Sequence, residues 1–207
     1  MMSHYYSEEQ DVESNPSVFT YRYEDYSLEL KTDSGVFSKG SIDYGSNVLI
    51  NAFLKEQSYP RILDVGCGYG PIGLMIAKVH PESTVDMVDV NTRALNLAEE
   101  NRRVNLIDNA VIYKSDALDA VEQSFDAILT NPPIRAGKDV VSRILDQSYD
   151  CLNVGGALFV VIQKKQGMPS AKKRMGGLFG NVEVVTKDKG YYILKSVKGC
   201  PNHVNLL

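Results

Sequence analysis

Strand-like and helix-like segments alternate along most of this 207-residue chain, and this order constrains the fold more than any other feature. Short apolar runs typical of buried strands alternate with stretches whose apolar residues recur at helical spacing. Strands are expected at 61–66, 84–90, 110–116, 125–133 and 155–163, a two-strand hairpin at 182–198, and helices at 42–57, 71–80, 91–105 and 139–153. This order predicts a largely parallel sheet with helices on both faces and a ligand site at the carboxyl ends of the strands.

The chain is expected to divide into three parts. Residues 1–16 form a polar, acidic tail, and residues 17–38 form a β-hairpin with a turn at Glu24-Asp25 and a segment that leads to the mouth of the ligand site. The alternating segments fill residues 39–200. A length of 207 residues suits one such domain with an appendage.

Composition excludes several classes of protein. With 43% apolar and 23% charged residues, the chain resembles neither collagen nor a long disordered protein. No apolar run reaches the ~18 residues of a membrane helix, and the first residues lack the pattern of a signal peptide. The three cysteines are far apart, and no cysteine or histidine cluster has metal-ligand spacing. We therefore expect a cytoplasmic protein with reduced thiols, no membrane partner and no metal.

Charge is unevenly distributed although the net value is only −4. Residues 1–33 hold eight acids against two bases, whereas residues 164–198 hold nine bases against two acids. A concentrated positive charge on an acidic protein suits a polyanionic partner.

The most informative segment is a glycine-rich turn, Asp64-Val-Gly66-Cys-Gly68-Tyr-Gly70, between a strand and a helix. Glycines let the main chain adopt conformations closed to other residues and let a ligand approach it closely. The helix that follows presents free N–H groups at its start. Further polar residues close the next three strands, namely Asp89, Asp116 and Asn131-Pro132-Pro133. Four polar signals at successive strand ends predict a cofactor site there.

These residues resemble the successive motifs of class I S-adenosylmethionine-dependent methyltransferases over about residues 35–198. The resemblance implies a Rossmann-like, seven-stranded, mostly parallel sheet whose last strand is antiparallel, which the hairpin at 182–198 would supply. It also implies S-adenosylmethionine as the cofactor. Its binding residues would be Asp64, Gly66, Gly68 and Gly70 around the methionine part, Asp89 and Val90 at the ribose, Asp116 and Ala117 at the adenine, and Asn131 near the methyl group.

The Asn131-Pro132-Pro133 segment suits transfer to a planar amino group. The Asn131 side-chain oxygen and the Pro132 carbonyl can accept hydrogen bonds from an NH₂ group and stabilise the positive charge that develops on its nitrogen. The prolines restrict the backbone, so these acceptors stay in place. We therefore expect Asn131, Pro132 and Pro133 to be catalytic. By resemblance, the acceptor is an exocyclic amine of a base or a glutamine side chain in a release factor.

A second motif narrows the choice of acceptor. The stretch Gly35-Val-Phe-Ser38, followed by Asp43-Tyr-Gly-Ser46, resembles ribosomal RNA small-subunit methyltransferase C and its relatives, which modify guanine-N2 in 16S rRNA. This implies ribosomal RNA or the small ribosomal subunit as the partner. The residues expected at the substrate are Phe37, Ser38, Lys39, Ile134 and Arg135, with Lys138 and the basic stretch 164–174, before a Gly176-Gly177 hinge, as phosphate contacts.

Two departures from that family are visible. Its larger members have an additional N-terminal domain, which this chain replaces with a short hairpin. Ile134 follows the two prolines, where many amino-methylating enzymes have an aromatic residue that stacks on the base, so Phe37 or Tyr44 would have to take that place. A protein glutamine methyltransferase, a nicotinamide-dependent oxidoreductase and a catalytically silent module for ribosome assembly remain as alternatives.

Overall fold

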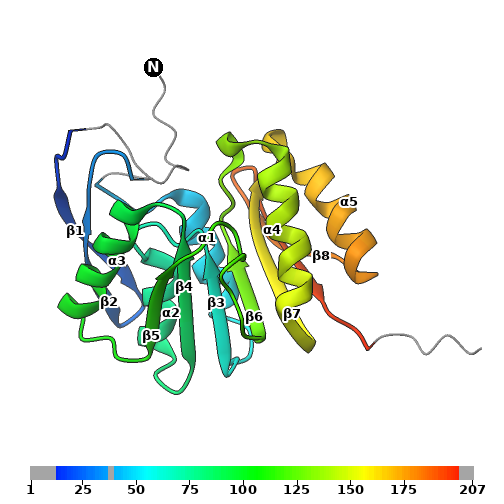
Figure 1. The fold of residues 1–207 in the computed structure, drawn as a ribbon, viewed down its shortest axis with the longest axis horizontal. Helices are drawn as coiled ribbons and strands as arrows, with labels where there is room; N and C mark the ends of the chain where they lie inside the picture. The colour runs from blue at the N-terminus through cyan, green and yellow to red at the C-terminus, as the bar shows by residue number, and fades with distance from the viewer. Residues whose placement is uncertain (1–12, 37–39, 201–207) are drawn as a thin grey trace, which may run out of the picture.

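Seven strands form one sheet in the computed structural model, which describes residues 13–36 and 40–200 (Figure 1). Two further strands, β1 Ser17–Tyr23 and β2 Tyr26–Thr32, form a separate hairpin. The strands of the seven-stranded sheet are β3 Arg61–Val65, β4 Thr84–Asp89, β5 Ala110–Lys114, β6 Phe125–Thr130, β7 Leu152–Gln163, β8 Glu183–Asp188 and β9 Tyr191–Val197. The α-helices are α1 Tyr44–Phe53, α2 Pro71–Val79, α3 Thr92–Val104, α4 Lys138–Cys151 and α5 Met168–Phe179.

The sheet has the order β5-β4-β3-β6-β7-β9-β8. The strands from β5 to β7 pair in parallel, and β9 lies antiparallel between β7 and β8. This confirms the expected Rossmann-like sheet with an antiparallel last strand. The chain order reverses between β3 and β6, so the loops that follow these two strands lie next to each other at one edge of the sheet.

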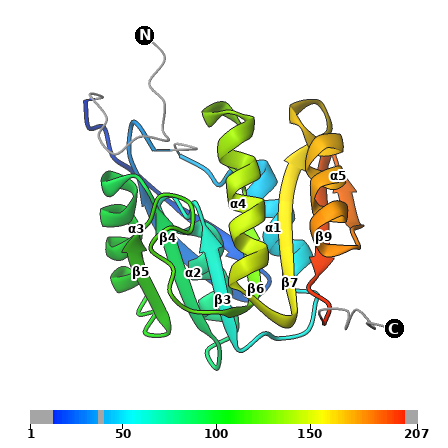
Figure 2. The ribbon, with the colours of Figure 1, turned by 45° about the vertical axis from the view of Figure 1, so that its right-hand side comes forward.

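Strand residues alternate between two apolar cores. Along β7, Phe159 and Val161 belong to the core under α1, α2 and α3, whereas Leu158 and Val160 belong to the core under α4 and α5. Figure 2 shows α4 and α5 on one face of the sheet with α1 behind the other. The period of two along a strand buried on both faces explains why its sequence is continuously apolar.

Helix α5 differs from the sequence expectation. Gly176 and Gly177 do not form a hinge, because both lie within the helix and Gly180 ends it with a left-handed backbone at φ 73°. The buried side chains Ala171, Met175 and Phe179 recur every four residues and hold the helix against the sheet. No helix within residues 13–36 and 40–200 has the length and apolarity to cross a bilayer.

The N-terminal hairpin packs as an additional layer beside α3 (Figure 1). Asn101 on α3 and Asn105, the residue that caps its end, each donate to and accept from the β2 main chain, at Lys31 and Glu29 respectively. The two carboxamides thus replace a neighbouring strand for β2. Leu28 on β2 is fully buried in the core of this face.

Candidate functional site

Main-chain hydrogen bonds fix the glycine-rich turn after β3. The amides of Gly66 and Cys67 both donate to the Val88 carbonyl of β4, at 2.8 and 2.9 Å. The Gly68 amide donates to Asp89 Oδ2 at 2.8 Å. One turn into α2, Gly73 donates to Asp64 Oδ2 at 2.9 Å. The turn is therefore held by the ends of two strands and needs little ordering when a ligand binds.

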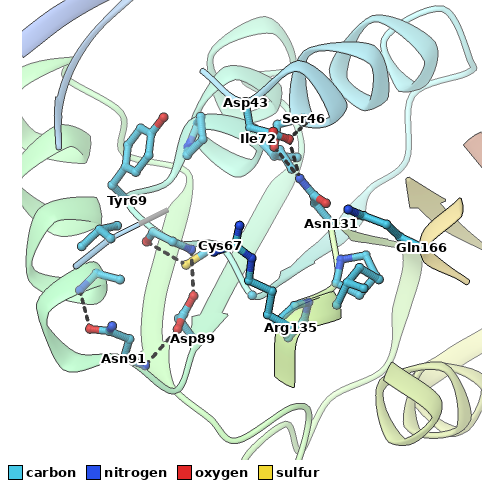
Figure 3. A pocket seen from close by; sticks show the side chains of 18 of the residues that line it. Asp43, Ser46, Cys67, Tyr69, Ile72, Asp89, Asn91, Asn131, Arg135 and Gln166 are labelled. Atoms are coloured by element: carbon cyan, nitrogen blue, oxygen red, sulfur yellow. Dashed lines mark hydrogen bonds between the residues drawn. The ribbon is translucent and has the colours of Figure 1, made fainter. Parts of the chain in front are cut away.

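A cavity of about 320 Å³ opens between this turn and the end of β6 (Figure 3). Asp89 and Asn91 lie on one side of it, and Asn131 and Gln166 lie on the other. The predicted site residues that line it are Gly66, Gly68, Asp89, Asn131, Pro132, Pro133, Ile134 and Arg135. The structure thus brings together the turn and the Asn-Pro-Pro segment, as the order of the strand ends requires.

Other predicted site residues lie away from the cavity wall. Asp64 is fully buried beneath the turn, and Gly70 begins α2 with φ 97°. Asp116 forms an ion pair with Arg143 of α4, and Ala117 adopts a left-handed backbone at φ 49°. Neither these four residues nor Val90 lines the cavity, so their contacts with the cofactor stay predictions. Phe37, Ser38 and Lys39 lie outside the described residues.

Burial raises the proton affinity of three groups near the turn. It raises the pKa of Asp64 to about 7 and also raises the pKa of Asp89, in both cases against hydrogen bonds from main-chain amides. Burial, reinforced by Asp89 and Asp64, raises the pKa of the Cys67 thiol well above its usual range. Cys67 therefore lines the cavity as a neutral thiol and is a poor nucleophile at neutral pH.

The raised pKa of Asp64 predicts a pH-dependent stability. Because the folded state holds this proton more tightly than the unfolded chain, its contribution to stability is lost as the pH rises from about 4 to about 7. Asp64→Asn should exceed the wild type by about 2–4 kcal/mol in unfolding free energy at pH 8, and the difference should vanish near pH 4. Thermal unfolding of both proteins across this range measures the effect.

The exposed Asp150→Asn variant is the control and should follow the wild type at every pH. A difference between wild type and Asp64→Asn that is the same at pH 5 and pH 8 would contradict the prediction.

The side chain of Asn131 is held in one orientation. Its Nδ2 donates to Asp43 Oδ2 at 2.9 Å and to Ser46 Oγ at 3.0 Å (Figure 3). Asp43 in turn caps α1, because the same Oδ2 accepts from the Ser46 amide at 3.0 Å. Within the described residues, no protein donor reaches the Asn131 Oδ1 oxygen.

Gly45 lies between Asp43 and Ser46 in the chain and permits a close approach of β9. A Cβ at this position would lie 2.8 Å from the Tyr191 ring and 3.0 Å from Asp43 Oδ2. Tyr191 lines the cavity, whereas Tyr44 packs behind it with ring centroids 5.6 Å apart. Tyr191, and not Tyr44, therefore supplies an aromatic side chain near Asn131. Ile134, at the position where many amino-methylating enzymes have an aromatic residue, is aliphatic and cannot do so.

Several cavity residues were not expected from the sequence. Gln163 is the last residue of β7 and Gln166 follows shortly after it, so the same search for polar residues at strand ends could have found them. Tyr191 begins the antiparallel strand β9 and carries no such signal. The other lining residues not expected at the site are Val36, Asp43, Ser46, Cys67, Tyr69, Pro71, Ile72, Asn91 and Ala94.

The cavity suits S-adenosylmethionine. Gly66 and Gly68 have φ values of 74° and 58°, and a Cβ on either would meet nothing within 4 Å, so their bare main chain is open to a ligand. Asp89 presents a carboxylate to the cavity, and beneath the turn the buried Asp64 Oδ1 has no hydrogen-bond partner among the described residues. Hydroxyl and ammonium groups of the cofactor match such acceptors.

Comparison with known proteins agrees with this arrangement. Residues 27–195 match the family model described as methyltransferase small domain. Uncharacterized protein YbxB of Bacillus subtilis (strain 168) is 49% identical over 200 residues, which cover 96% of this chain and all of that protein. Ribosomal RNA large subunit methyltransferase G of Pseudomonas putida (strain W619) is 32% identical over 191 residues, which cover 89% of this chain and 50% of that enzyme.

Among solved structures, the T. thermophilus 16S rRNA N2 methyltransferase in complex with AdoMet and guanosine has a TM-score of 0.79 and 25% sequence identity. The match covers 88% of this chain and 50% of that one. The chain thus spans all of the Bacillus protein but about half of the two ribosomal RNA methyltransferases.

Proposed function

The chain belongs to the methyltransferase small domain family, and we propose that this S-adenosylmethionine-dependent methyltransferase modifies an exocyclic amine of ribosomal RNA, most specifically guanine-N2. The observation that carries the proposal is the fixed carboxamide of Asn131, whose Oδ1 is left as a hydrogen-bond acceptor at the cavity. An acceptor at the reacting position selects a nucleophile that donates N–H.

Bound S-adenosylmethionine supplies a methyl group already activated by its sulfonium, so the chain has to position the nucleophile. Asp89, Gly66 and Gly68 would hold the cofactor on one side of the cavity. Asn131 Oδ1 and the Pro132 carbonyl would accept the two N–H bonds of the acceptor amine and favour a pyramidal nitrogen. As the nitrogen lone pair forms the bond to the methyl carbon, the carbon–sulfur bond breaks and the sulfur leaves as a neutral thioether. The positive charge thus passes to the nitrogen, where these acceptors stabilise it. The resulting aminium loses its proton readily to water, so no carboxylate base is required.

Exposed cations beside the Asn131 side of the cavity support RNA as the acceptor. Arg135 lines the cavity, and Lys164 and Lys165 lie between the lining residues Gln163 and Gln166. The Lys164 amide donates to the Gly190 carbonyl at 2.9 Å, so the β8–β9 turn with Lys189 lies alongside. We call these four cations, Arg135, Lys164, Lys165 and Lys189, the basic rim.

The positive charge of the basic rim is available to phosphate, although the Lys189 ammonium also lies over the Tyr44 ring, 4.8 Å from its centroid. None of its members forms an ion pair with another described residue. By contrast, Arg174, from the basic stretch predicted to contact phosphate, is paired with Asp146 and links α5 to α4. Lys172 and Lys173 are exposed on α5, farther along the chain from the lining residues.

The basic rim predicts a salt-dependent affinity for RNA. Replacing Lys164, Lys165 and Lys189 by alanine should weaken binding to ribosomal RNA and lower the slope of log K against log salt by about 2, because each phosphate neutralised on a single strand adds ~0.7 to that slope. Lys55→Ala removes an exposed lysine beyond the far end of α1 and should leave the slope unchanged. Filter binding at several salt concentrations measures both, and an unchanged slope in the triple variant would remove the rim from the interface.

Methyl transfer tests the function itself. Labelled S-adenosylmethionine would be incubated with unmodified small subunits, large subunits, naked ribosomal RNA and release factor, followed by nucleoside analysis. We expect label in N2-methylguanosine of ribosomal RNA, and we propose that an enzyme with this substrate acts in the cytoplasm. Label in another nucleoside would overturn the guanine assignment, and label in the release factor would identify a glutamine methyltransferase instead. Absence of label in every substrate, with cofactor binding intact, would contradict the proposal and favour a silent assembly module.

A further inference from the structure

We infer that Asp43 and Ser46 are positioning residues that hold the Asn131 carboxamide with its oxygen toward the acceptor. The inference rests on the proposed function and deepens it, because it says how the site selects an amine. Asp43 and Ser46 lie 88 and 85 residues from Asn131 in the chain, yet both accept hydrogen bonds from its Nδ2. We call these three side chains the carboxamide clamp.

The Asp43 carboxylate determines the orientation of the Asn131 side-chain amide. The oxygen and nitrogen of an asparagine side chain can exchange places by a flip about χ2, so neighbours must decide between the two. An ionised carboxylate only accepts hydrogen bonds. The Asp43 carboxylate at 2.9 Å therefore requires the NH₂ group of Asn131 on its side and excludes the oxygen.

The clamp is itself rigid. Asp43 precedes α1 and accepts from the Ser46 amide, so the start of the helix holds the carboxylate in place and its dipole favours the negative charge. Ser46 is 4% exposed and sits in the first turn of the same helix. Each member thus contacts the other two, and Gly45 keeps room for the Tyr191 ring beside them.

Orientation decides which nucleophile the site accepts. With Nδ2 turned to α1, Asn131 offers its oxygen, which binds N–H donors such as an exocyclic amine. A flipped side chain would offer its NH₂ group instead. That group binds hydrogen-bond acceptors, such as a carbonyl oxygen or a ring nitrogen, and would not hold an exocyclic amine by its N–H bonds. Loss of the clamp should therefore lower kcat while the affinity for S-adenosylmethionine stays unchanged, since none of the three clamp residues belongs to the glycine-rich turn.

The first test needs no substrate. The side-chain NH₂ resonances of Asn131 in ¹⁵N-asparagine-labelled protein are identified by their loss in Asn131→Ala. We expect both protons to exchange with water more slowly than those of Asn96, an exposed asparagine on α3. Ser46→Ala should accelerate exchange and shift the resonances, whereas Asp43→Asn, which keeps a capping and accepting oxygen, should preserve most of the protection. Exchange as fast as at Asn96 in the wild type would overturn the inference.

The second test measures transfer to the acceptor found for the wild type. Ser46→Ala and Asp43→Ala should lower kcat by about 10–100-fold, the range expected for misplacement of a reacting group. Asp43→Asn should retain activity closer to the wild type, which separates the clamp from a need for negative charge. In an Asn131→Ala background, Ser46→Ala should have no further effect on kcat, because it acts only through Asn131.

The outcomes distinguish the two proposals. Equal losses from Ser46→Ala with and without Asn131 would overturn the positioning role even if guanine is the acceptor. A wild-type enzyme that methylates no RNA would refute the proposed function, and the exchange rates of Asn131 would still decide whether the clamp exists. If Asp43→Ala fails to fold because its helix cap is lost, Ser46→Ala decides alone, since it leaves the cap intact.

Discussion

Asn131→Ala should lower methyl transfer by about 10²–10³-fold, the usual effect of removing one preorganised hydrogen-bonding group from a charge-developing transition state. The variant loses the Oδ1 acceptor at the cavity but leaves the glycine-rich turn untouched. Its affinity for S-adenosylmethionine should therefore stay within about twofold of the wild type, because that turn supplies most of the expected contacts. Single-turnover transfer and calorimetric cofactor titration measure the two quantities separately.

The variant is expected to fold. Without Asn131, the buried Ser46 hydroxyl loses its one hydrogen bond to the described residues, which costs some stability, but Asp43 still accepts from the Ser46 amide and remains the cap of α1. Asn51→Ala is a matched control, since this asparagine is half-buried on α1 and hydrogen-bonds within the helix, away from the cavity. Parallel losses of transfer and cofactor affinity in Asn131→Ala would show that Asn131 acts as a cofactor ligand and not on the acceptor.

Much of the fold could be predicted because its signals are local. The alternation of apolar strands and amphipathic helices fixed the order of elements, and Asn91 caps α3 as its sequence position suggests. Helix α5 was missed because two adjacent glycines are unfavourable within a helix. There the burial of Met175 and Phe179 against the sheet outweighs the intrinsic preference.

The candidate site was predictable only where it follows from strand ends. Gly66, Asp89 and Asn131 end or follow strands that the topology gathers at one edge. The contact between Asp43 and Asn131 depends on where α1 crosses the sheet, and nothing local in either segment encodes it. Tyr191 reaches the cavity because β9 runs antiparallel and begins at this edge. A search limited to the carboxyl ends of strands therefore does not find it.

Asp89→Ala should weaken S-adenosylmethionine binding by about 10²–10³-fold, since a carboxylate hydrogen bond contributes about 1.5–3 kcal/mol and the change affects more than one. The carboxylate faces the cavity and also accepts from the amides of Gly68 and Asn91, at 2.8 and 2.9 Å. Alanine therefore removes the carboxylate predicted to bind the ribose hydroxyls and releases the turn that carries Gly68. Both effects reduce affinity, and the second should appear as faster amide exchange at Gly68.

Asp86→Ala tests whether the loss of cofactor affinity is specific to the carboxylate at the cavity or follows from the removal of any buried acid of β4. Asp86 is 6% exposed on the same strand, but its carboxylate accepts from the Tyr113 hydroxyl at 3.0 Å and does not line the cavity. It should lower the melting temperature while the dissociation constant for S-adenosylmethionine changes little. If both variants lose cofactor affinity equally, Asp89 acts through the stability of β4. If only Asp89→Ala does, the carboxylate binds the cofactor directly or holds the turn that does, and amide exchange at Gly68 separates those two roles.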